Sequence, residues 1–463
     1  MKNLSKLAKR ILCICLAVLL SLGMFAGCGT GNSGEQPPET VPKSTDAPTD
    51  SGTESLATAE PVEIEFWHHY PSGEGAELMT ALINEFMEKN PHIKVKELGL
   101  GLGEQGEKLV PALAAGTAPD IMVYDLSTVK ERAMKGQTMS LNAFVEAAGM
   151  DMSVYFPATV EACTYEGELY GLPYMTDTRV LFYNKDHFRA AGLDPEVAPK
   201  SWDELLEYAE KLTVLGDDGK ATQVGMSLNI FEIAPWIMGW SFGANIWNED
   251  GTPNVNSAEM QSALEYVLKL QETVGLDNYN ALNEAAGSTG VPAFVNGTIS
   301  MCVQFNGFYN TIETYNPDMD FGVALIPSHD GVNDHASWGA GYSLEFCYKG
   351  DDARAQAAFE LGQFLCSDEV ASRFILTTSD FVCNMNAYQH PDVQADPVWQ
   401  CFMESGKVTK MHYFCPALPT WHWGTLLPEW QAATIGNKTP EQALADAQKN
   451  IEQEIQNYNM MNG

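Results

Sequence analysis

A segment near the C-terminal end of the chain, "PTWHWGTLLPEW", concentrates aromatic side chains. Trp421 and Trp423 lie two positions apart, so in a strand-like or turn segment both point to one edge, with His422 on the opposite side. The proline that opens the segment, with Pro416 just before it, argues against a regular buried element. Flat indole faces can stack on the apolar face of a ligand ring. We therefore expect Trp421 and Trp423 to bind a ligand.

Polar and aromatic residues also follow two strands of a predicted sheet. His68, His69 and Tyr70 come after the first strand, and Tyr124 and Asp125 close the third. In open sheets of parallel strands, ligands bind outside the carboxyl ends of the strands. We expect these five residues to line a cleft at that edge.

The elements that must position these residues alternate along the chain. Strands are predicted from β-branched and alternating runs, and helices from apolar residues at helical spacing. The strands are predicted at 62–67, 92–98, 119–125, 180–188, 299–305 and 320–327, and the helices at 73–89, 107–116, 201–212, 352–366 and 440–455. Such alternation is typical of an α/β fold in which helices cross over between parallel strands.

The N-terminus has the pattern of an export signal. Its first ten residues carry four positive charges and no negative one, and an apolar run over 11–25 follows. This run is shorter than the roughly 20 residues that span a membrane. The run ends in "MFAGC", which resembles a bacterial lipobox, although an ordinary signal peptide with an incidental cysteine is the alternative. We expect residues 1–27 to be removed and lipid on Cys28 to hold the exported chain at the outer face of the cell membrane of a Gram-positive-type bacterium.

The composition of the residues after the signal predicts a tether, a two-lobe folded part and a strongly acidic protein. Residues 28–60 are rich in Gly, Ser, Thr, Pro and Glu without an aromatic residue, which predicts a disordered tether. The roughly 400 residues beyond them exceed what one hydrophobic core serves, so two lobes are expected. The net charge is −35, and removal of the signal leaves 22 basic against 61 acidic side chains. This charge argues against nucleic acid as a partner.

Two other sequence patterns, the scattered cysteines and a glycine-rich run at 101–106, give little indication of function. The seven remaining cysteines are scattered and indicate neither a zinc site nor a disulfide framework, although one or two bridges stay open. The run "GLGEQG" fits a dinucleotide-binding fingerprint, but Pro111 falls in the following helix and an exported protein meets little NAD. We interpret this run as a glycine-rich turn between a strand and a helix, and we expect no cofactor and no metal.

An ordered set of motifs carries a resemblance. "IEFWHHY", "LINEFMEKNPHIKV", "LAAGTAPDIMVYD", "GELYGLPYMTDTRVLFYNKDHFRAAGLDP", "SWDELLEYAEKLT", "FVNGTISM", "FGVALIP" and "PEQALADAQKNI" occur in this order across 61–455. Together they resemble the extracellular solute-binding proteins of ABC sugar importers, the family of maltose-binding protein. The resemblance implies two α/β lobes of the type II periplasmic-binding-protein kind, each a mainly parallel sheet flanked by helices, with the ligand in a cleft between them.

The resemblance also places the lobes. It implies an N-lobe of 61–176 plus 326–378 and a C-lobe of 177–325 plus 379–463. The crossovers between the lobes fall near 175–179, 323–327 and 378–381. A ligand that touches both lobes would favour their closure, and the closed form would be recognised by the permease of the transporter. We expect a monomer.

Further site residues follow from matching motifs. The resemblance nominates Asp177 at the first crossover, where Arg179 is available to pair with it instead, and a ring-stacking aromatic at Trp423. It also nominates, from "NIFEIAPWIMGW", "QFNGFYN" and "SWGAGYS", the residues Phe231, Glu232, Trp236, Phe308, Tyr309, Trp338 and Gly341. Trp240 is assigned to the core.

The expected ligand is a neutral oligosaccharide, because sugars need flat aromatic walls and planar polar groups around their hydroxyl edges. A polyamine would suit an acidic cleft with indole faces, and a glycerol phosphodiester or other phosphate would need clustered basic residues. A secreted glycosidase would need a pair of carboxylates, and no pair stands out in the sequence. We therefore expect a binding protein with no catalytic residues.

Overall fold

The computed structural model of the chain describes residues 61–331 and 335–462. The signal segment, Cys28 and the tether predicted over 28–60 lie outside the described residues, so lipid attachment stays a prediction. Among the described residues, no helix has the length and apolar character needed to cross a membrane.

The first sheet contains six strands in the order β14-β6-β13-β3-β1-β2. Its members are β1 (Val62–His68), β2 (Ile93–Gly99), β3 (Ile121–Asp125), β6 (Gly171–Thr176), β13 (Gly341–Phe346) and β14 (Phe381–Val382). β1 runs parallel to β2 and β3, whereas β13 is antiparallel to β3 and β6, and β14 is antiparallel to β6. The sheet is therefore mixed, with the predicted parallel part at one end.

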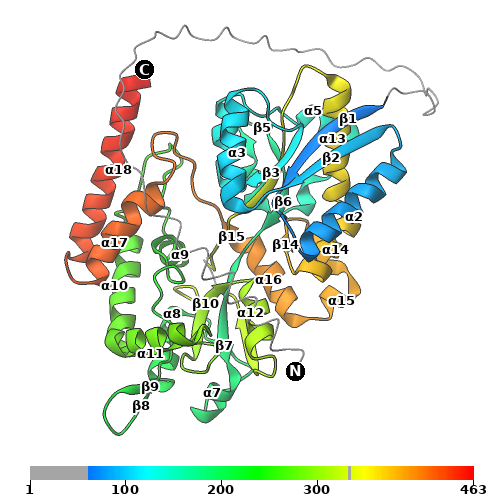
Figure 1. Cartoon of the computed structure of the whole chain (residues 1–463). Helices are drawn as coiled ribbons and strands as arrows, with labels where there is room; N and C mark the ends of the chain where they lie inside the picture. Colours follow the sequence, from blue (N-terminus) through cyan, green and yellow to red (C-terminus); the bar gives the residue numbers. More distant parts are fainter. Residues whose placement is uncertain (1–60, 332–334, 463) are drawn as a thin grey trace, which may run out of the picture. The chain divides into compact units, whose positions relative to one another are not determined.

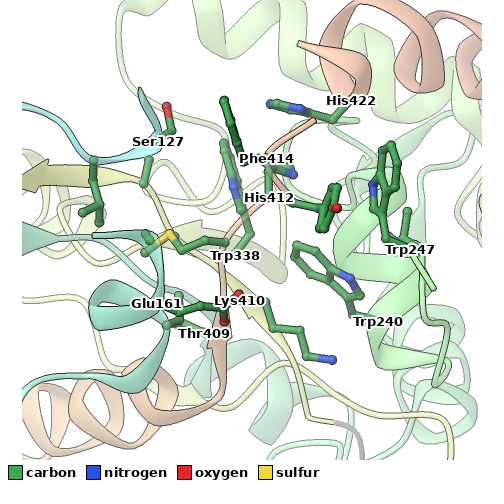
Figure 2. Close-up of a pocket in the computed structure, with 18 of the residues that line it drawn as sticks. Ser127, Glu161, Trp240, Trp247, Trp338, Thr409, Lys410, His412, Phe414 and His422 are labelled. Carbon is green, nitrogen blue, oxygen red and sulfur yellow. The ribbon is translucent and has the colours of Figure 1, made fainter. Parts of the chain in front are cut away.

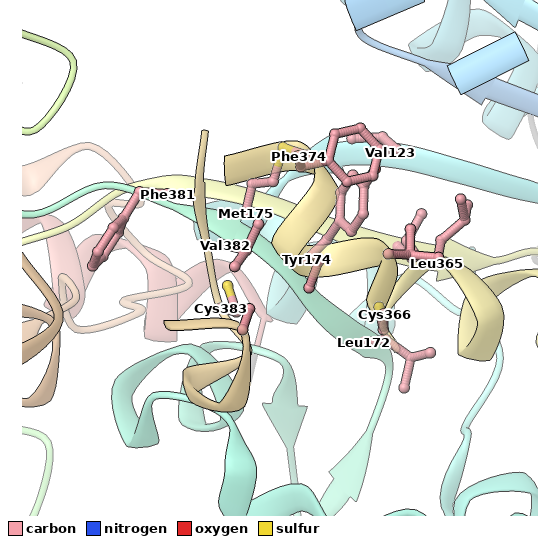
Figure 3. Close-up of a cluster of buried hydrophobic side chains, with 14 of the residues drawn as sticks. Val123, Leu172, Tyr174, Met175, Leu365, Cys366, Phe374, Phe381, Val382 and Cys383 are labelled. Atoms are coloured by element: carbon pink, nitrogen blue, oxygen red, sulfur yellow. The ribbon is translucent and has the colours of Figure 1, made fainter. Parts of the chain in front are cut away.

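Helices cover both faces of the first sheet. On one face, α2 (Glu74–Lys89), α13 (Asp352–Leu365) and α14 (Asp368–Thr378) contribute to the first core (Figure 1). On the other face, α3 (Leu102–Ala114) packs Leu109 against Met122 of β3. Figure 3 shows part of the first core, where the ring of Phe374 lies edge-on to Tyr174 with 5.7 Å between centroids.

The second sheet corrects the predicted strand direction. It has three strands, β7 (Arg179–Asn184), β10 (Met301–Phe305) and β11 (Phe321–Ala324), and β7 is antiparallel to both neighbours. The expectation of mainly parallel sheets is therefore wrong for this sheet, and in the first sheet it holds only for the pairings of β1 with β2 and β3. Continuous apolar runs indicate burial on both faces but not strand direction.

β7 separates two hydrophobic cores. Val180 and Phe182 face the first core, while Leu181 and Tyr183 face the second. The second core is built by helices α8 (Trp202–Lys211), α9 (Pro235–Ser241), α10 (Ala258–Val274), α11 (Leu276–Thr289), α17 (Leu427–Thr434) and α18 (Pro440–Asn462). The first core reaches β7 through α12 (Phe308–Tyr315) and α16 (Pro397–Val408).

Shorter elements complete the described residues. They are η1 (Leu126–Thr128), α4 (Val129–Met134), α5 (Asn142–Ala148), η2 (Met152–Val154), α6 (Pro157–Ala162), β4 (Thr164–Tyr165), β5 (Glu168–Leu169), α7 (Lys185–Ala190), β8 (Val214–Leu215), β9 (Ala221–Gln223), β12 (Ser337–Trp338), η3 (Met385–Gln389), α15 (Pro391–Gln394), β15 (Thr409–Lys410) and η4 (His422–Leu426). The strands and helices predicted from the sequence are present with shifted boundaries, except that the second half of the strand predicted over 180–188 is wrong, because Lys185 begins α7.

The connection between the sheets is short. β6 ends at Thr176 and β7 begins at Arg179, so Asp177 and Thr178 alone join them there. β14 follows the third predicted crossover and pairs with β6 of the first sheet. The lobe boundaries themselves stay a prediction. The seven cysteines among the described residues are free, and most are buried.

Candidate ligand-binding cleft

A cleft of about 820 Å³ collects residues from segments far apart in the sequence. Figure 2 shows Ser127 and Glu161 on one side of this cleft and Trp240 and Trp247 on the other. We call the first side the polar wall, which comes from η1, α4 and α6. We call the second side the aromatic wall, which comes from α9, β12, β15, η4 and the loops at 244–247 and 411–414.

Three indole rings form the centre of the aromatic wall. Trp236 is fully buried, and its ring centroid lies 5.4 Å from Trp338 and 4.7 Å from Trp423, at interplanar angles of 69° and 82°. Trp338 and Trp423 lie 5.6 Å apart at 71°. Edge-to-face packing of this kind is the favoured geometry for aromatic pairs. Trp236 therefore acts as a base that fixes the rings of Trp338 and Trp423, which line the cleft.

Two histidines pack beside these indoles. The rings of His412 and His422 stack with centroids 3.5 Å apart, and both line the cleft. Burial lowers the pKa of His422 to about 4 and that of His412 well below its ordinary value, so both imidazoles are neutral at neutral pH. His422 opens η4, a π-helical turn, and such turns often occur at functional sites.

An ion pair at the connection between the sheets supports Trp338. Arg179 Nη1 donates to Asp177 Oδ1 at 2.5 Å and to the Trp338 carbonyl at 2.8 Å. Asp177 Oδ1 also accepts from the Ala340 amide at 2.7 Å. The Arg179 guanidinium lies 3.9 Å from the centroid of the Trp338 ring. Asp177, expected to face the ligand, is thus engaged with Arg179 and is not among the residues that line the cleft.

The polar wall is fixed by a buried arginine. Arg132 Nε donates to Glu345 Oε2 at 2.7 Å, and Nη2 donates to the Asp125 carbonyl at 2.9 Å. The Asp125 carboxylate accepts from the Ser127 amide at 2.9 Å and so caps η1. Lys130 and Glu161 line the same wall on α4 and α6.

The structure brings some of the predicted residues together. Asp125, Trp338, Trp421 and Trp423 line the cleft. Phe231 is exposed, and its ring centroid lies 6.0 Å from that of Trp423. Trp240, assigned to the core from the sequence, is buried and still lines the cleft.

The predicted trio after β1 lies elsewhere. His68 is buried beside Glu97, His69 stacks on Tyr342 with 4.4 Å between centroids, and the Tyr70 hydroxyl donates to Asp380. Strand β2 supplies Glu97, strand β13 supplies Tyr342, and the segment between α14 and β14 supplies Asp380. The three residues therefore pack inside the protein rather than on the cleft.

The remaining predicted residues also have structural partners. Phe308 is a core residue against Phe182, because the second sheet is covered on both faces. Four more predicted residues do not line the cleft. Tyr124 lies under the Arg132 guanidinium and Glu232 accepts from Gln304. Tyr309 donates to Asp396, and Gly341 belongs to β13. A Cβ on Gly341 would approach the Met175 carbonyl oxygen to 2.2 Å, so sheet packing alone accounts for this glycine.

Several lining residues were missed. Trp247 stacks on Tyr413 with 4.5 Å between centroids, and Lys130, Lys410 and Phe414 also line the cleft. The aromatic run "MHYF" at 411–414 was the available signal for part of this set. No group of three or more metal-ligating side chains occurs among the described residues.

Comparison with known proteins identifies the family. A model for the bacterial extracellular solute-binding proteins matches residues 81–399, which covers most of the folded chain. The chain belongs to this family. Its members are exported binding proteins, so this chain is an exported solute-binding protein and not an enzyme.

Among curated relatives, the sn-glycerol-3-phosphate-binding periplasmic proteins UgpB of Escherichia coli strain K12 and of Salmonella typhimurium are similar. Each is 29% identical over 270 residues, covering 57% of this chain and 60% of the relative. The chain thus spans less than two thirds of the length of these relatives.

Solved structures share the fold. CpMnBP1 with mannotriose bound is 25% identical with a TM-score of 0.67, covering 85% of this chain and 100% of that one. The sugar-binding protein MalE from Xanthomonas citri is 20% identical with a TM-score of 0.75, covering 86% and 99%. The two-lobe α/β fold of type II periplasmic binding proteins is therefore confirmed.

Proposed function

We propose that this solute-binding protein captures a carbohydrate in the cleft between its two lobes and delivers it to the permease of an ABC transporter. In this proposal, lipid on Cys28 holds the protein at the outer face of the cell membrane. Closure of the lobes around the sugar would create the surface that the permease recognises.

The aromatic wall is the observation that carries this proposal. Trp240, Trp247, Trp338 and Trp423 line one side of a cleft of about 820 Å³, within the range of roughly 300–1,000 Å³ typical of small-ligand sites. Rings fixed by edge-to-face contacts lose little freedom when a sugar stacks on them, so the binding surface is preorganised. CpMnBP1, bound to mannotriose, supports a ligand of this class.

A phosphorylated polyol is the second candidate. The UgpB relatives are named for sn-glycerol 3-phosphate, at 29% identity. The lining also contains Lys130, Lys407 and Lys410, which a phosphate could contact. Glycerol 3-phosphate and a glycerol phosphodiester therefore belong in any ligand screen.

Isothermal titration calorimetry of the purified protein against mannobiose, mannotriose, maltotriose and glycerol 3-phosphate tests the proposal. We expect a saccharide to bind and Trp338→Ala to weaken it by about thirtyfold, the effect of losing an interface anchor worth about 2 kcal/mol. Tyr348→Ala is the matched control, since Tyr348 is exposed and contacts Asp352. Trp338→Phe should keep much of the affinity because it keeps a ring.

Two negative results would contradict the proposal in different ways. If no saccharide of a broad library binds or raises the melting temperature, carbohydrate capture is wrong. If only glycerol 3-phosphate binds, the second candidate replaces the first.

A further inference from the structure

Polar atoms without partners are concentrated in the aromatic wall. Among the described residues, twelve buried side-chain nitrogen and oxygen atoms have no hydrogen-bond partner, and six of them belong to this wall. They are Nε1 of Trp236, Trp247 and Trp338, both ring nitrogens of His412, and Nδ1 of His422. Such atoms destabilise a folded protein and are rare. A wall that keeps so many of them serves a purpose other than folding, and ligand recognition is such a purpose.

His422 brings a ring nitrogen to the surface of the cleft. The residue lines the cleft although it is only 8% exposed. Its Nδ1 is buried without a partner, whereas its Nε2 is not buried and makes no hydrogen bond within the described part of the chain. Figure 2 shows this imidazole among the side chains that surround the cleft. His422 Nε2 is therefore placed to contact a bound ligand.

The protein does not fix which nitrogen of His422 carries the proton. Burial lowers the pKa of His422 to about 4, so at neutral pH the ring is neutral, with one nitrogen that donates and one that accepts. In a neutral histidine, the hydrogen bond made by one nitrogen decides where the proton lies. Because Nδ1 makes no such bond, Nε2 can either donate to a ligand or accept from it. A hydroxyl group also does both, so this imidazole suits sugar hydroxyls in either orientation.

His412 and the indoles around it hold the His422 ring in place. The two imidazoles stack with centroids 3.5 Å apart and an interplanar angle of 19°. The ring of His412 lies edge-on to Trp236 at 4.8 Å and to Trp421 at 5.8 Å. The ring of His422 also lies edge-on to Trp236, at 5.6 Å. Packing of this kind is favourable only in defined orientations, so His422 keeps its Nε2 at the surface of the cleft.

We propose that His422 recognises a hydroxyl group of the bound carbohydrate through Nε2, and that His412 is the positioning residue that holds the ring of His422. This inference rests on the proposed function and extends it from stacking on indole faces to the hydroxyl edge of the sugar. When Nε2 donates to the hydroxyl, Nδ1 carries no proton. When Nε2 accepts from the hydroxyl, the proton of the ring lies on Nδ1.

Calorimetry with mannotriose and maltotriose tests the role of His422. His422→Phe keeps an aromatic ring but removes both nitrogens, so the trisaccharide that wild type binds should bind about tenfold more weakly, because one of its hydroxyls loses a partner. His422→Gln keeps a donor and an acceptor and should lose no more than about threefold. His187→Phe is the matched control, since His187 Nδ1 lies 3.0 Å from Ser300 Oγ outside the lining. Its affinity should equal that of wild type.

Variants of His412 separate ring stacking from hydrogen bonding. His412→Ala removes the ring that holds His422 and should weaken binding by about fivefold. His412→Phe keeps a ring there and should bind within about twofold of wild type. His412→Phe also removes two buried nitrogens without partners, so we expect its melting temperature to rise by about 1–3 °C. His187→Phe breaks a hydrogen bond and should instead melt at a lower temperature.

Nitrogen NMR of protein labelled at histidine provides a direct signature. The nitrogen signals of a neutral imidazole differ between its two tautomers, and loss of signals in His422→Phe or His422→Gln assigns those of His422. We expect both tautomers of His422 in the free protein and a single one after the bound trisaccharide is added. A histidine that only fills space would keep its signals unchanged.

The possible failures are distinguishable. If His422→Phe binds the trisaccharide as tightly as wild type, or if the tautomers of His422 do not change when it is added, hydroxyl recognition by His422 is wrong and carbohydrate capture stands. If His412→Phe melts below wild type, the nitrogens of His412 stabilise the fold, and the positioning role is wrong. If wild type binds neither trisaccharide nor any other saccharide of a broad library, carbohydrate capture itself is wrong.

Discussion

The two walls of the cleft are held in different ways. The polar wall rests on a buried ion pair, in which the Arg132 and Glu345 side chains are 6% and 0% exposed. In the aromatic wall Trp236 packs edge-to-face against its neighbours, and the Arg179–Asp177 ion pair that supports Trp338 is less deeply buried, at 12% and 26% exposed. A second buried glutamate, Glu232, has Gln304 rather than a cation as its partner.

The two buried glutamates show what this difference means. Glu345 meets a guanidinium, so its charge is compensated where water is absent. Burial raises the pKa of Glu232 to about 8, because no cation offsets the loss of water. The polar wall therefore depends on a fully buried charge pair, and the aromatic wall on ring packing together with the Arg179–Asp177 pair beside Trp338. We therefore expect Arg132→Ala to lower the free energy of unfolding, and Glu232→Gln to change how stability depends on pH.

The largest effect is expected for Arg132→Ala. It leaves the buried Glu345 carboxylate without a cation, with only the Ser343 hydroxyl as a donor, and frees the Asp125 carbonyl. Breaking a buried pair by removing one member costs about 3–5 kcal/mol of folding free energy. Urea denaturation measures this loss.

The exposed pair on the same helix provides the control. Lys135 and Glu131 form a surface ion pair, and Lys135→Ala should change stability by less than about 1 kcal/mol. If the two alanine variants unfold at the same urea concentration, the polar wall does not depend on its buried pair.

The second prediction concerns pH and the buried Glu232. The unfolded chain ionises Glu232 near 4.5, while the folded chain keeps its proton up to about 8. The folded state thus binds more protons between these values, so the contribution of Glu232 is fully present below about pH 4.5 and is lost as pH rises to 8. We expect Glu232→Gln to remove a decline on the order of 2–4 kcal/mol across this window.

Denaturation midpoints at pH 5, 6.5 and 8 measure this slope. The exposed Glu284 on α11 offers the matched variant, and Glu284→Gln should keep the slope of wild type. A Glu232→Gln protein whose stability falls with pH as steeply as wild type would show that Glu232 is not protonated in the folded state.

Most helices and strands could be predicted from the sequence because their caps and apolar patterns are encoded in neighbouring residues. The helix of 201–212 has a serine cap and a clear apolar face, and Ser201 does accept from the Glu204 amide. Strand direction in the second sheet was not readable, since β7 is buried on both faces and such runs look alike in parallel and antiparallel sheets. β13 lies far beyond β3 and β6 along the chain and is inserted between them by tertiary contacts alone.

The site was readable only in part. The rule that ligands lie beyond strand ends selected His68, His69 and Tyr70, but Asp380 and Tyr342 come from distant segments to cover them. Local aromatic density selected Trp421 and Trp423, which both line the cleft, and their contact with a ligand stays a prediction. Residue types show which chemistry is available, whereas the covering of a strand end depends on contacts that the local sequence does not contain.

The smallest effect is expected for Trp423→Ala. Its side chain is 36% exposed, so less of its surface is already packed than at Trp236, and a ligand that stacks there leaves one edge in water. We expect about fivefold weaker ligand binding, equivalent to about 1 kcal/mol, with a smaller change in stability. Calorimetry with the best saccharide of the screen measures this, and Phe231→Ala, which removes the neighbouring exposed ring, gives the comparison. Unchanged affinity in Trp423→Ala, with thirtyfold loss in Trp338→Ala, would restrict the stacking surface to Trp338 and place Trp423 among the supporting rings.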